Sequence, residues 1–182
     1  LRVRNIRMGK AHLDDEIAVI LDLLNDAWSD NWGFVPMTPR EMADLAGILK
    51  RLLRPGDVAF AEYRGEVAAF SIIFPNLNEA IRDLGGRLAP FGWLKLLWRL
   101  KVQHTRTMRM ALMGVRKSLQ SSAIGAALAL SVIQAMRQTG IERGVEHAEL
   151  SWVLDSNEQV KRIIKLVGAE PYKRYRVYEK TL

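Results

Sequence analysis

The sequence predicts one α+β domain of 182 residues, with helices flanking a central mixed, mostly antiparallel sheet. A hydrophobic content of 49% is enough to bury one substantial core. Two apolar runs, residues 58–63 and 67–74, flank Arg64-Gly65-Glu66 and predict an antiparallel hairpin. Strands expected over 106–115 and 147–154 are joined by a helical stretch, which implies a parallel pair.

The first part of the chain predicts a strand followed by two helices. Residues 1–7 alternate between apolar and polar side chains, as an edge strand does. Asp14-Asp15 is expected to open a helix, because acids favour the positive end of the helix dipole. Its apolar side chains are Ile17, Ile20, Leu21 and Leu24. Thr38 precedes Glu41 by three residues, a capping box that predicts a second helix over 38–53.

The second part contains an insertion, residues 76–105, between the third and fourth strands. Further along, a helix over 120–138 is expected to end at Gly140. The other expected elements are short helices over 78–84, 91–101 and 157–167 and a final strand over 172–179.

Composition limits the function. The chain has no cysteine, which excludes disulfides, thiolate metal sites and cysteine nucleophiles and favours the cytoplasm. Residues 88–100, the most apolar candidate, are too short to span a bilayer, so we expect no integral membrane segment. The chain begins with Leu1 rather than methionine, which is consistent with a fragment of a longer protein.

The net charge of +7 is unevenly distributed, because residues 84–141 contain no Asp or Glu. Such a basic stretch attracts phosphate groups, nucleic acid or an acidic membrane surface. A solvated basic face without a dedicated ligand is the alternative interpretation.

The main chemical motif lies where the strand at 110–115 leads into the helix at about residue 120. The first backbone N–H groups of a helix lack acceptors within it and form a natural anion site. Small residues allow an anion to approach the backbone, and no acid is near in the sequence. The residues at this junction are Gln120, Ser121, Ser122, Ala123, Gly125 and Ala126.

This junction resembles the acetyl-CoA pyrophosphate loop of the GNAT N-acetyltransferase superfamily, Arg/Gln-x-x-Gly-x-Gly/Ala. Gln120 stands in the first place and Gly125 in the last, whereas Ala123 replaces the middle glycine. The order of elements is similar to that family over nearly the whole chain. The resemblance implies a GNAT fold with splayed fourth and fifth strands, acetyl-CoA or another acyl-CoA as cofactor, and transfer to an amine.

A second landmark, residues 151–157, resembles the fifth strand of the family and the Asn that follows it. The resemblance implies that the pantetheine arm of the cofactor lies along Leu112, Met113 and Val115, and that Asn157 contacts the cofactor. A helix N-cap is an equally weighted role for Asn157, and the two roles are compatible.

The usual catalytic pair of the family is missing. Ile164 stands where many members have a Tyr general acid, and the fourth strand carries no Glu. Tyr172 and Tyr175 are the candidate acids and Glu149 is the candidate base. The alternative for each is an ordinary surface side chain on a strand.

By the same resemblance, the aromatic loop between the first two helices borders the acceptor pocket. Trp28, Asp30, Asn31 and Trp32 are therefore the candidate acceptor-binding residues. The alternative is that the loop aromatics, Trp32 among them, seal the core. The three histidines lack the spacing of metal ligands, so no metal site is expected.

Three functions remain open at this point: an acyl-CoA:amine N-acyltransferase acting by direct attack, an attenuated acyl-CoA-binding or partner-binding module, and a nucleic-acid-binding domain. We favour the first, with a small-molecule amine as acceptor and no nucleic acid as partner. A homodimer is one arrangement we consider. The amphipathic segment 91–101 is a candidate to cover the substrate site, contact a partner subunit or touch a membrane surface.

Overall fold

The computed structural model describes residues 1–103 and 105–180. Its contacts divide the chain into two compact units, Leu1–Trp152 and Val153–Leu182. Within the described part, no helix has the length and apolar character needed to cross a membrane.

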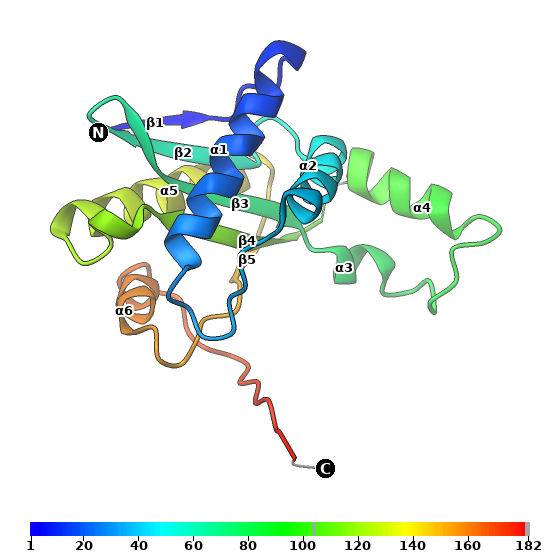
Figure 1. The fold of residues 1–182 in the computed structure, drawn as a ribbon. Coiled ribbons are helices and arrows are strands. Elements are labelled where there is room, and N and C mark those ends of the chain that lie inside the picture. The colour runs from blue at the N-terminus through cyan, green and yellow to red at the C-terminus, as the bar shows by residue number, and fades with distance from the viewer. Residues whose placement is uncertain (104, 181–182) are drawn as a thin grey trace. The chain divides into compact units, whose positions relative to one another are not determined.

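The first unit is built on a five-stranded sheet in the order β1-β2-β3-β4-β5 (Figure 1). The strands are β1 (Arg2–Asn5), β2 (Val58–Tyr63), β3 (Glu66–Pro75), β4 (Thr107–Val115) and β5 (His147–Leu150). The first four pair antiparallel in succession, whereas β4 and β5 are parallel. The expected mixed, mostly antiparallel sheet with a parallel β4/β5 pair is confirmed.

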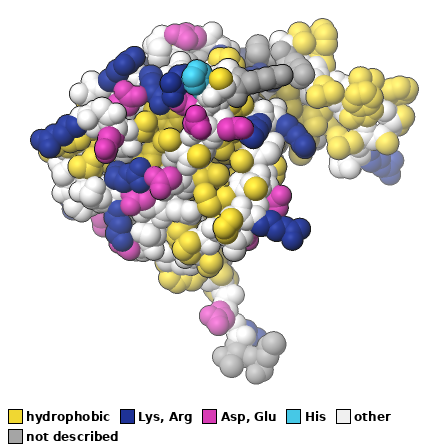
Figure 2. All heavy atoms as spheres, turned by 45° about the horizontal axis from the view of Figure 1, so that its top comes forward, with side chains coloured by type: hydrophobic (Ala, Val, Ile, Leu, Met, Phe, Trp, Pro, Cys, Tyr) yellow, Lys and Arg dark blue, Asp and Glu magenta, His cyan; other side chains and the backbone are white. Residues whose placement is uncertain are grey.

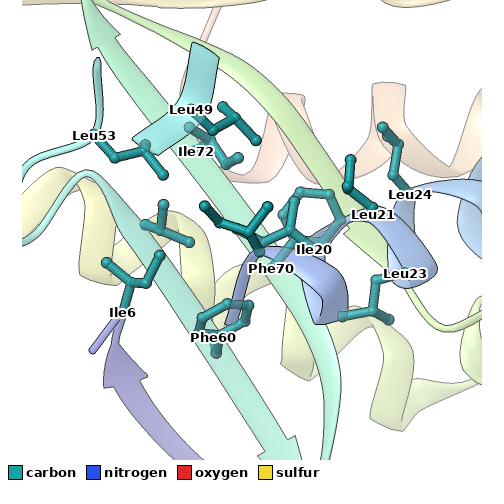
Figure 3. Packing of buried hydrophobic residues seen from close by; sticks show 12 residues of the cluster. Ile6, Ile20, Leu21, Leu23, Leu24, Leu49, Leu53, Phe60, Phe70 and Ile72 are labelled. Carbon is teal, nitrogen blue, oxygen red and sulfur yellow. The ribbon is translucent and has the colours of Figure 1, made fainter. Parts of the chain in front are cut away.

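Two helices, α1 (Lys10–Trp28) and α2 (Pro39–Leu52), pack on one face of this sheet. Figure 3 shows Ile20 of α1 beside Phe70 of β3; both belong to one core cluster with Phe60 of β2, and all three are fully buried. The four apolar positions expected on α1 are buried here too. The expected capping box forms at Thr38, which bonds Glu41 reciprocally and starts α2.

Helix α5 (Ala123–Glu142) packs against β2, β3 and β4 and lies behind the sheet in the view of Figure 1. Between β3 and β4 the chain forms α3 (Leu77–Ile81), α4 (Gly92–Trp98) and a π-helical turn, Arg99–Gln103. These elements extend beyond the sheet edge in Figure 1. The second unit contains α6 (Glu158–Leu166).

Three sequence expectations are corrected. Helix α1 begins at Lys10, so Asp14 and Asp15 lie in its second turn, not at its start. Gly140 does not end α5; Gly144, at a φ of 69°, does. A Cβ at position 140 would come 2.8 Å from Cε of Met108, so glycine there permits close helix–sheet packing.

The third correction concerns residues 172–179, which form no strand in the part of the chain that the structure describes. A strand is stable only when its N–H and C=O groups pair with a neighbouring strand. Residues 172–179 pair with no strand of the described sheet, so the expected final strand does not form.

A buried ion-pair cluster joins β1 to α1. The Glu16 carboxylate, 2% exposed, contacts the guanidinium groups of Arg4 and Arg7 at 2.6 Å each. Burial raises the pKa of Glu16, but hydrogen bonds from Arg4 and Arg7 outweigh it and leave the pKa below its ordinary value. The cluster therefore stabilises the fold while Glu16 is ionised.

Glu16→Gln is expected to lower the free energy of unfolding by about 3 kcal/mol at neutral pH, because it leaves two cations without their buried partner. Since the folded-state pKa is lowered, this stability is present above the unfolded pKa and is lost as the pH falls below about 4. Urea unfolding of both proteins across this range measures the difference. A difference that stayed constant down to acid pH would contradict the account, and Glu66→Gln on the exposed hairpin turn is the control.

Candidate functional site

The site begins where β4 continues beyond its neighbour. The strands β4 and β5 pair from Thr107↔His147 to Met110↔Leu150, and the N–H of Ser151 still donates to the Met110 carbonyl at 3.1 Å. The pairing of β4 with β3 shifts register at the same place, since Ile72 faces Leu112 whereas Ile73 faces Met110. The extra residue, Ala111, is a β-bulge, a feature that bends a strand and re-aims its groups.

Beyond the bulge, alternate residues of β4 direct their backbone groups away from β3. The N–H of Arg116 donates to the Ala68 carbonyl at 2.7 Å. Because hydrogen-bonded and non-hydrogen-bonded residues alternate in an antiparallel pair, this bond shows which residues of β4 face β3. Met113 and Val115 therefore present N–H and C=O groups to the edge that β5 has left, whereas the backbone groups of Leu112, which is opposite Ile72, face β3. Both carbonyls are occupied by side chains: Trp28 Nε1 donates to Met113 at 3.1 Å, and Gln120 Nε2 donates to Val115 at 3.0 Å.

A short turn leads from this edge into α5. A 3-10 turn, Lys117–Leu119, follows Arg116, and Ser122 caps the helix by accepting from the N–H of Gly125 at 3.0 Å. Ala123 and Ile124 occupy the first two helical positions, whose N–H groups have no acceptor within the helix. Ser121 through Ile124 are exposed, so an anion can reach these groups.

Gly125 is buried beneath this helix start. A Cβ at this position would lie 2.0 Å from the Leu119 carbonyl oxygen and 2.8 Å from its carbon, which is too close for any side chain. Ala126 follows with its N–H bonded to the Ser122 carbonyl at 3.1 Å. The small residues at the junction thus hold the turn against the first turn of α5.

The expectation that no acid lies near this junction is wrong in three dimensions. Asp26 at the end of α1 accepts from the Lys117 N–H at 2.8 Å. Asp30 pairs with the Lys117 ammonium at 2.7 Å, and Asp22 pairs with Arg116 at 2.9 Å. Asp22 and Asp26 lie four residues apart on α1, a helical spacing that could have predicted an acidic edge but not its partner, and Asp30 follows the end of that helix. Sequence reasoning also missed Arg116 and Lys117 as residues of the site.

The aromatic loop is divided between core and surface. Trp28 packs at the edge of the core and meets Phe34 edge to face, with ring centroids 6.3 Å apart. Trp32 is 75% exposed, so sealing of the core, the alternative weighed for it, does not occur. Asn31 is half-buried, and its backbone bridges Trp28 and Phe34. The structure thus places Trp28 and Asp30 beside the β4–α5 junction.

The candidate acid and base residues lie in different units. Glu149 of β5 faces Arg109 of β4 and accepts two hydrogen bonds from it, at 2.7 and 3.1 Å. This pair lies one position before the last paired residues of the two strands. Tyr172 and Tyr175 are exposed and belong to the second unit, so their role remains a prediction. In that unit Asn157 caps α6, accepting from the Val160 N–H at 3.1 Å, and its contact with a cofactor also remains a prediction.

Comparison with solved structures identifies the fold. A probable acetyltransferase superposes with a TM-score of 0.60 at 13% identity, covering 100% of this chain and 98% of the other. The aminoglycoside acetyltransferase AAC(6')-Iy, in complex with the bisubstrate analogue CoA-S-monomethyl-acetylneamine, superposes with a TM-score of 0.57 at 14% identity, covering 100% and 98%. The chain has the GNAT acetyltransferase fold. The strand expected over 147–154 is shorter than predicted, because β5 ends at Leu150. This early end and the bulge at Ala111 agree with the splayed fourth and fifth strands that the resemblance implied.

Two curated relatives share this sequence closely. The bacterial ceramide synthase of Caulobacter vibrioides (strain NA1000 / CB15N) is 45% identical over 176 residues, which are 97% of this chain and 46% of the relative. Protein YghO of Escherichia coli (strain K12) is 45% identical over 175 residues, 96% of this chain and 45% of the relative. The GNAT-fold chain thus spans about half the length of the curated relatives it matches. No protein-family model matches the chain.

Proposed function

We propose that this chain is an acyl-CoA-dependent N-acyltransferase domain that joins an acyl group to an amine. The observation that carries the proposal is the β4–α5 junction, where a strand edge without a β5 partner leads directly into an exposed helix start. The GNAT fold adds support, because AAC(6')-Iy with the same fold has been solved in complex with CoA. A thioester donor with phosphate groups at its far end suits both parts of this junction.

The residues of the junction fit such a donor. The N–H groups of Ala123 and Ile124 would hold the pyrophosphate, with Arg116 and Lys117 as the nearest cations. The N–H groups of Met113 and Val115, which face the same edge, would donate to carbonyls of the pantetheine arm. The Met113 carbonyl would accept from an amide of the arm only where the Trp28 indole gives up its hydrogen bond. Because Asp26 occupies the Lys117 N–H, we assign phosphate binding to the helix start and not to the turn before it.

The acceptor we propose is a long-chain amino alcohol. A ceramide is the amide of such an amine with a fatty acid, and the Caulobacter relative is named a ceramide synthase. In the reaction the amine nitrogen attacks the thioester carbonyl carbon, the carbon–sulfur bond breaks, and an amide forms. The proton released by the amine balances the departing CoA thiolate, which leaves as the free thiol.

Positioning supplies most of the catalysis in this scheme, since holding two reactants in line lowers the barrier by about 7–11 kcal/mol. Glu149, held by Arg109, is the proposed base for the ammonium form of the acceptor. Tyr172 and Tyr175 are the proposed donors to the leaving thiolate. Trp28 and Asp30 are the proposed contacts of the acceptor with the first unit, with Asn31 and Trp32 on the adjoining loop.

The test measures amide formation directly. The chain is incubated with acetyl-CoA or palmitoyl-CoA and a long-chain amino alcohol, and free thiol and amide are quantified by thiol titration and mass spectrometry. Equal amounts of thiol and amide are expected, together with slower turnover in Glu149→Gln. Acyl-CoA binding without any amide, across short and long amines, would refute the enzyme and leave a binding module.

Trp28→Phe is expected to tighten CoA binding about fivefold, because it removes the indole donor that occupies the Met113 carbonyl, a hydrogen bond of about 1 kcal/mol. The ring packing against Phe34 is kept. Calorimetric titration with CoA measures the change. Weaker binding by this variant would show that the wild-type indole keeps its hydrogen bond to Met113 when CoA binds. The pantetheine arm would then use other backbone groups.

A further inference from the structure

The insertion arm, residues 77–103, carries an apolar surface that the rest of the chain does not cover. No residue of α4 is buried, although five of its seven side chains are apolar. Trp93, Leu94, Leu97 and Trp98 are spaced to share one face of the helix, and each is at least 44% exposed. Phe91, 72% exposed, precedes them. Figure 2 shows hydrophobic side chains gathered on the projection at the right of the molecule.

The base of the insertion arm is attached by hydrogen bonds to the sheet and to the turn that follows α2, so its apolar surface is held in a defined position. Glu79 accepts from the backbone N–H groups of Arg106 and Thr107 at 2.8 and 3.0 Å, at the start of β4. Arg99 donates to the Ala80 carbonyl at 2.8 Å, and the Arg54 guanidinium donates to the Leu100 carbonyl. Only the outer part of the arm extends into solvent.

The charges of the arm are mostly positive, with five Lys or Arg against two acids. Both acids are engaged, Glu79 with β4 and Asp83 with Lys95 and Arg99. Hydrogen bonds from Arg99 and Lys95 lower the pKa of Asp83, so its charge stays balanced inside the arm. Arg82 and Arg87, which belong to the same arm, are exposed.

We infer that the insertion arm docks the protein on the surface of a phospholipid bilayer that contains acidic head groups. Tryptophan and phenylalanine beside leucine on one face, with Arg and Lys around them, are the side chains that enter the boundary between head groups and acyl chains. A protein partner would bury the same apolar face, but it would not need the surrounding cations, whereas anionic head groups complement them. Docking would bring the domain to the layer in which long-chain amines and acyl chains reside, although it does not depend on turnover.

Vesicle flotation tests this inference. The chain is mixed with vesicles of phosphatidylglycerol and phosphatidylcholine in equal parts, or of phosphatidylcholine alone, and the floating fraction is measured. Wild type is expected to float with the mixed vesicles, and much less with the neutral ones. The combined variant Phe91→Ser, Leu97→Ser and Trp98→Ser is expected to bind at least about tenfold more weakly. Arg82→Gln with Arg87→Gln is expected to remove most of the preference for acidic lipid.

The matched control replaces three apolar residues elsewhere that are at least as exposed, Val35, Leu166 and Val177, with serine and is expected to float like wild type. Circular dichroism and CoA titration verify that each variant is folded. Wild type that stays with the bulk solution, or an arm variant that floats unchanged, would overturn the inference. So would sedimentation showing a wild-type dimer that the arm variant dissociates, because the face would then bind a second copy.

Discussion

Gly125→Ala is expected to lower the free energy of unfolding by about 3 kcal/mol and to weaken CoA binding at least about tenfold. The added Cβ would lie 2.0 Å from the Leu119 carbonyl oxygen, a backbone atom that no rotamer change can move away. Either the turn or the start of α5 must shift. Both movements displace the N–H groups of Ala123 and Ile124, so stability and affinity fall together.

The matched control for this variant is Gly47→Ala in α2. No atom lies within 4 Å of a Cβ built at Gly47, so alanine there is expected to raise stability by about 1 kcal/mol through helix propensity alone. Urea unfolding and calorimetric titration with CoA measure both variants. A Gly125→Ala protein that bound CoA like wild type would show that this junction does not hold the pyrophosphate.

The second large effect is expected at the opposite end of α5. Arg143→Met should cost about 3 kcal/mol of unfolding free energy, because it leaves the carboxylate of Asp57, which is 1% exposed, without its cation. Arg143 Nη1 lies 2.5 Å from Asp57, and Arg143 Nη2 donates to the Pro55 carbonyl at 2.8 Å. The pair joins the end of α5 to the turn before β2.

The loss should depend on pH in a defined direction. Burial raises the pKa of Asp57 above its ordinary value although hydrogen bonds from Arg143 lower it, so removal of Arg143 raises this pKa further. A raised folded-state pKa contributes stability that is present below the unfolded pKa and is lost as the pH rises. The deficit of Arg143→Met should therefore be largest at neutral pH and shrink in acid, as urea unfolding across this range measures.

Asp57→Asn, added to Arg143→Met, should restore part of the stability because it removes the buried charge. Arg137→Met, at an exposed position of the same helix, should change stability by less than about 0.5 kcal/mol. If the double variant were less stable than Arg143→Met alone, the loss would not arise from the unpaired carboxylate.

Local signals predicted much of the fold. The hairpin at Arg64-Gly65 and the capping box at Thr38 and Glu41 formed as expected, because each depends on residues adjacent in the chain. The prediction that Gly140 ends the helix was wrong for a reason that the sequence does not show. The absence of a side chain at Gly140 makes room for Met108 of β4. Residues 172–179 carry aromatic and β-branched side chains that favour a strand, yet a strand also requires a pairing partner, which composition does not supply.

The candidate site was predictable in its backbone and not in its electrostatics. Small residues after an apolar strand located the junction from Gln120 to Ala126 correctly as a strand-to-helix turn. Asp26 and Lys117 are in contact although they are 91 residues apart in the sequence, so no local pattern could predict their contact. The contact of Trp28 with the Met113 carbonyl is also long-range. Trp28, predicted as an acceptor-binding residue, therefore also occupies a backbone group at the strand edge.

Calorimetric titration of the chain with an acyl-CoA is the most direct test of the central claim, that the β4–α5 junction holds an acyl donor. We expect one molecule of acetyl-CoA or palmitoyl-CoA bound per chain, with binding weakened at least about tenfold in Gly125→Ala and unchanged in Gly47→Ala. Absence of binding with both donors, in a chain that unfolds cooperatively, would contradict the account.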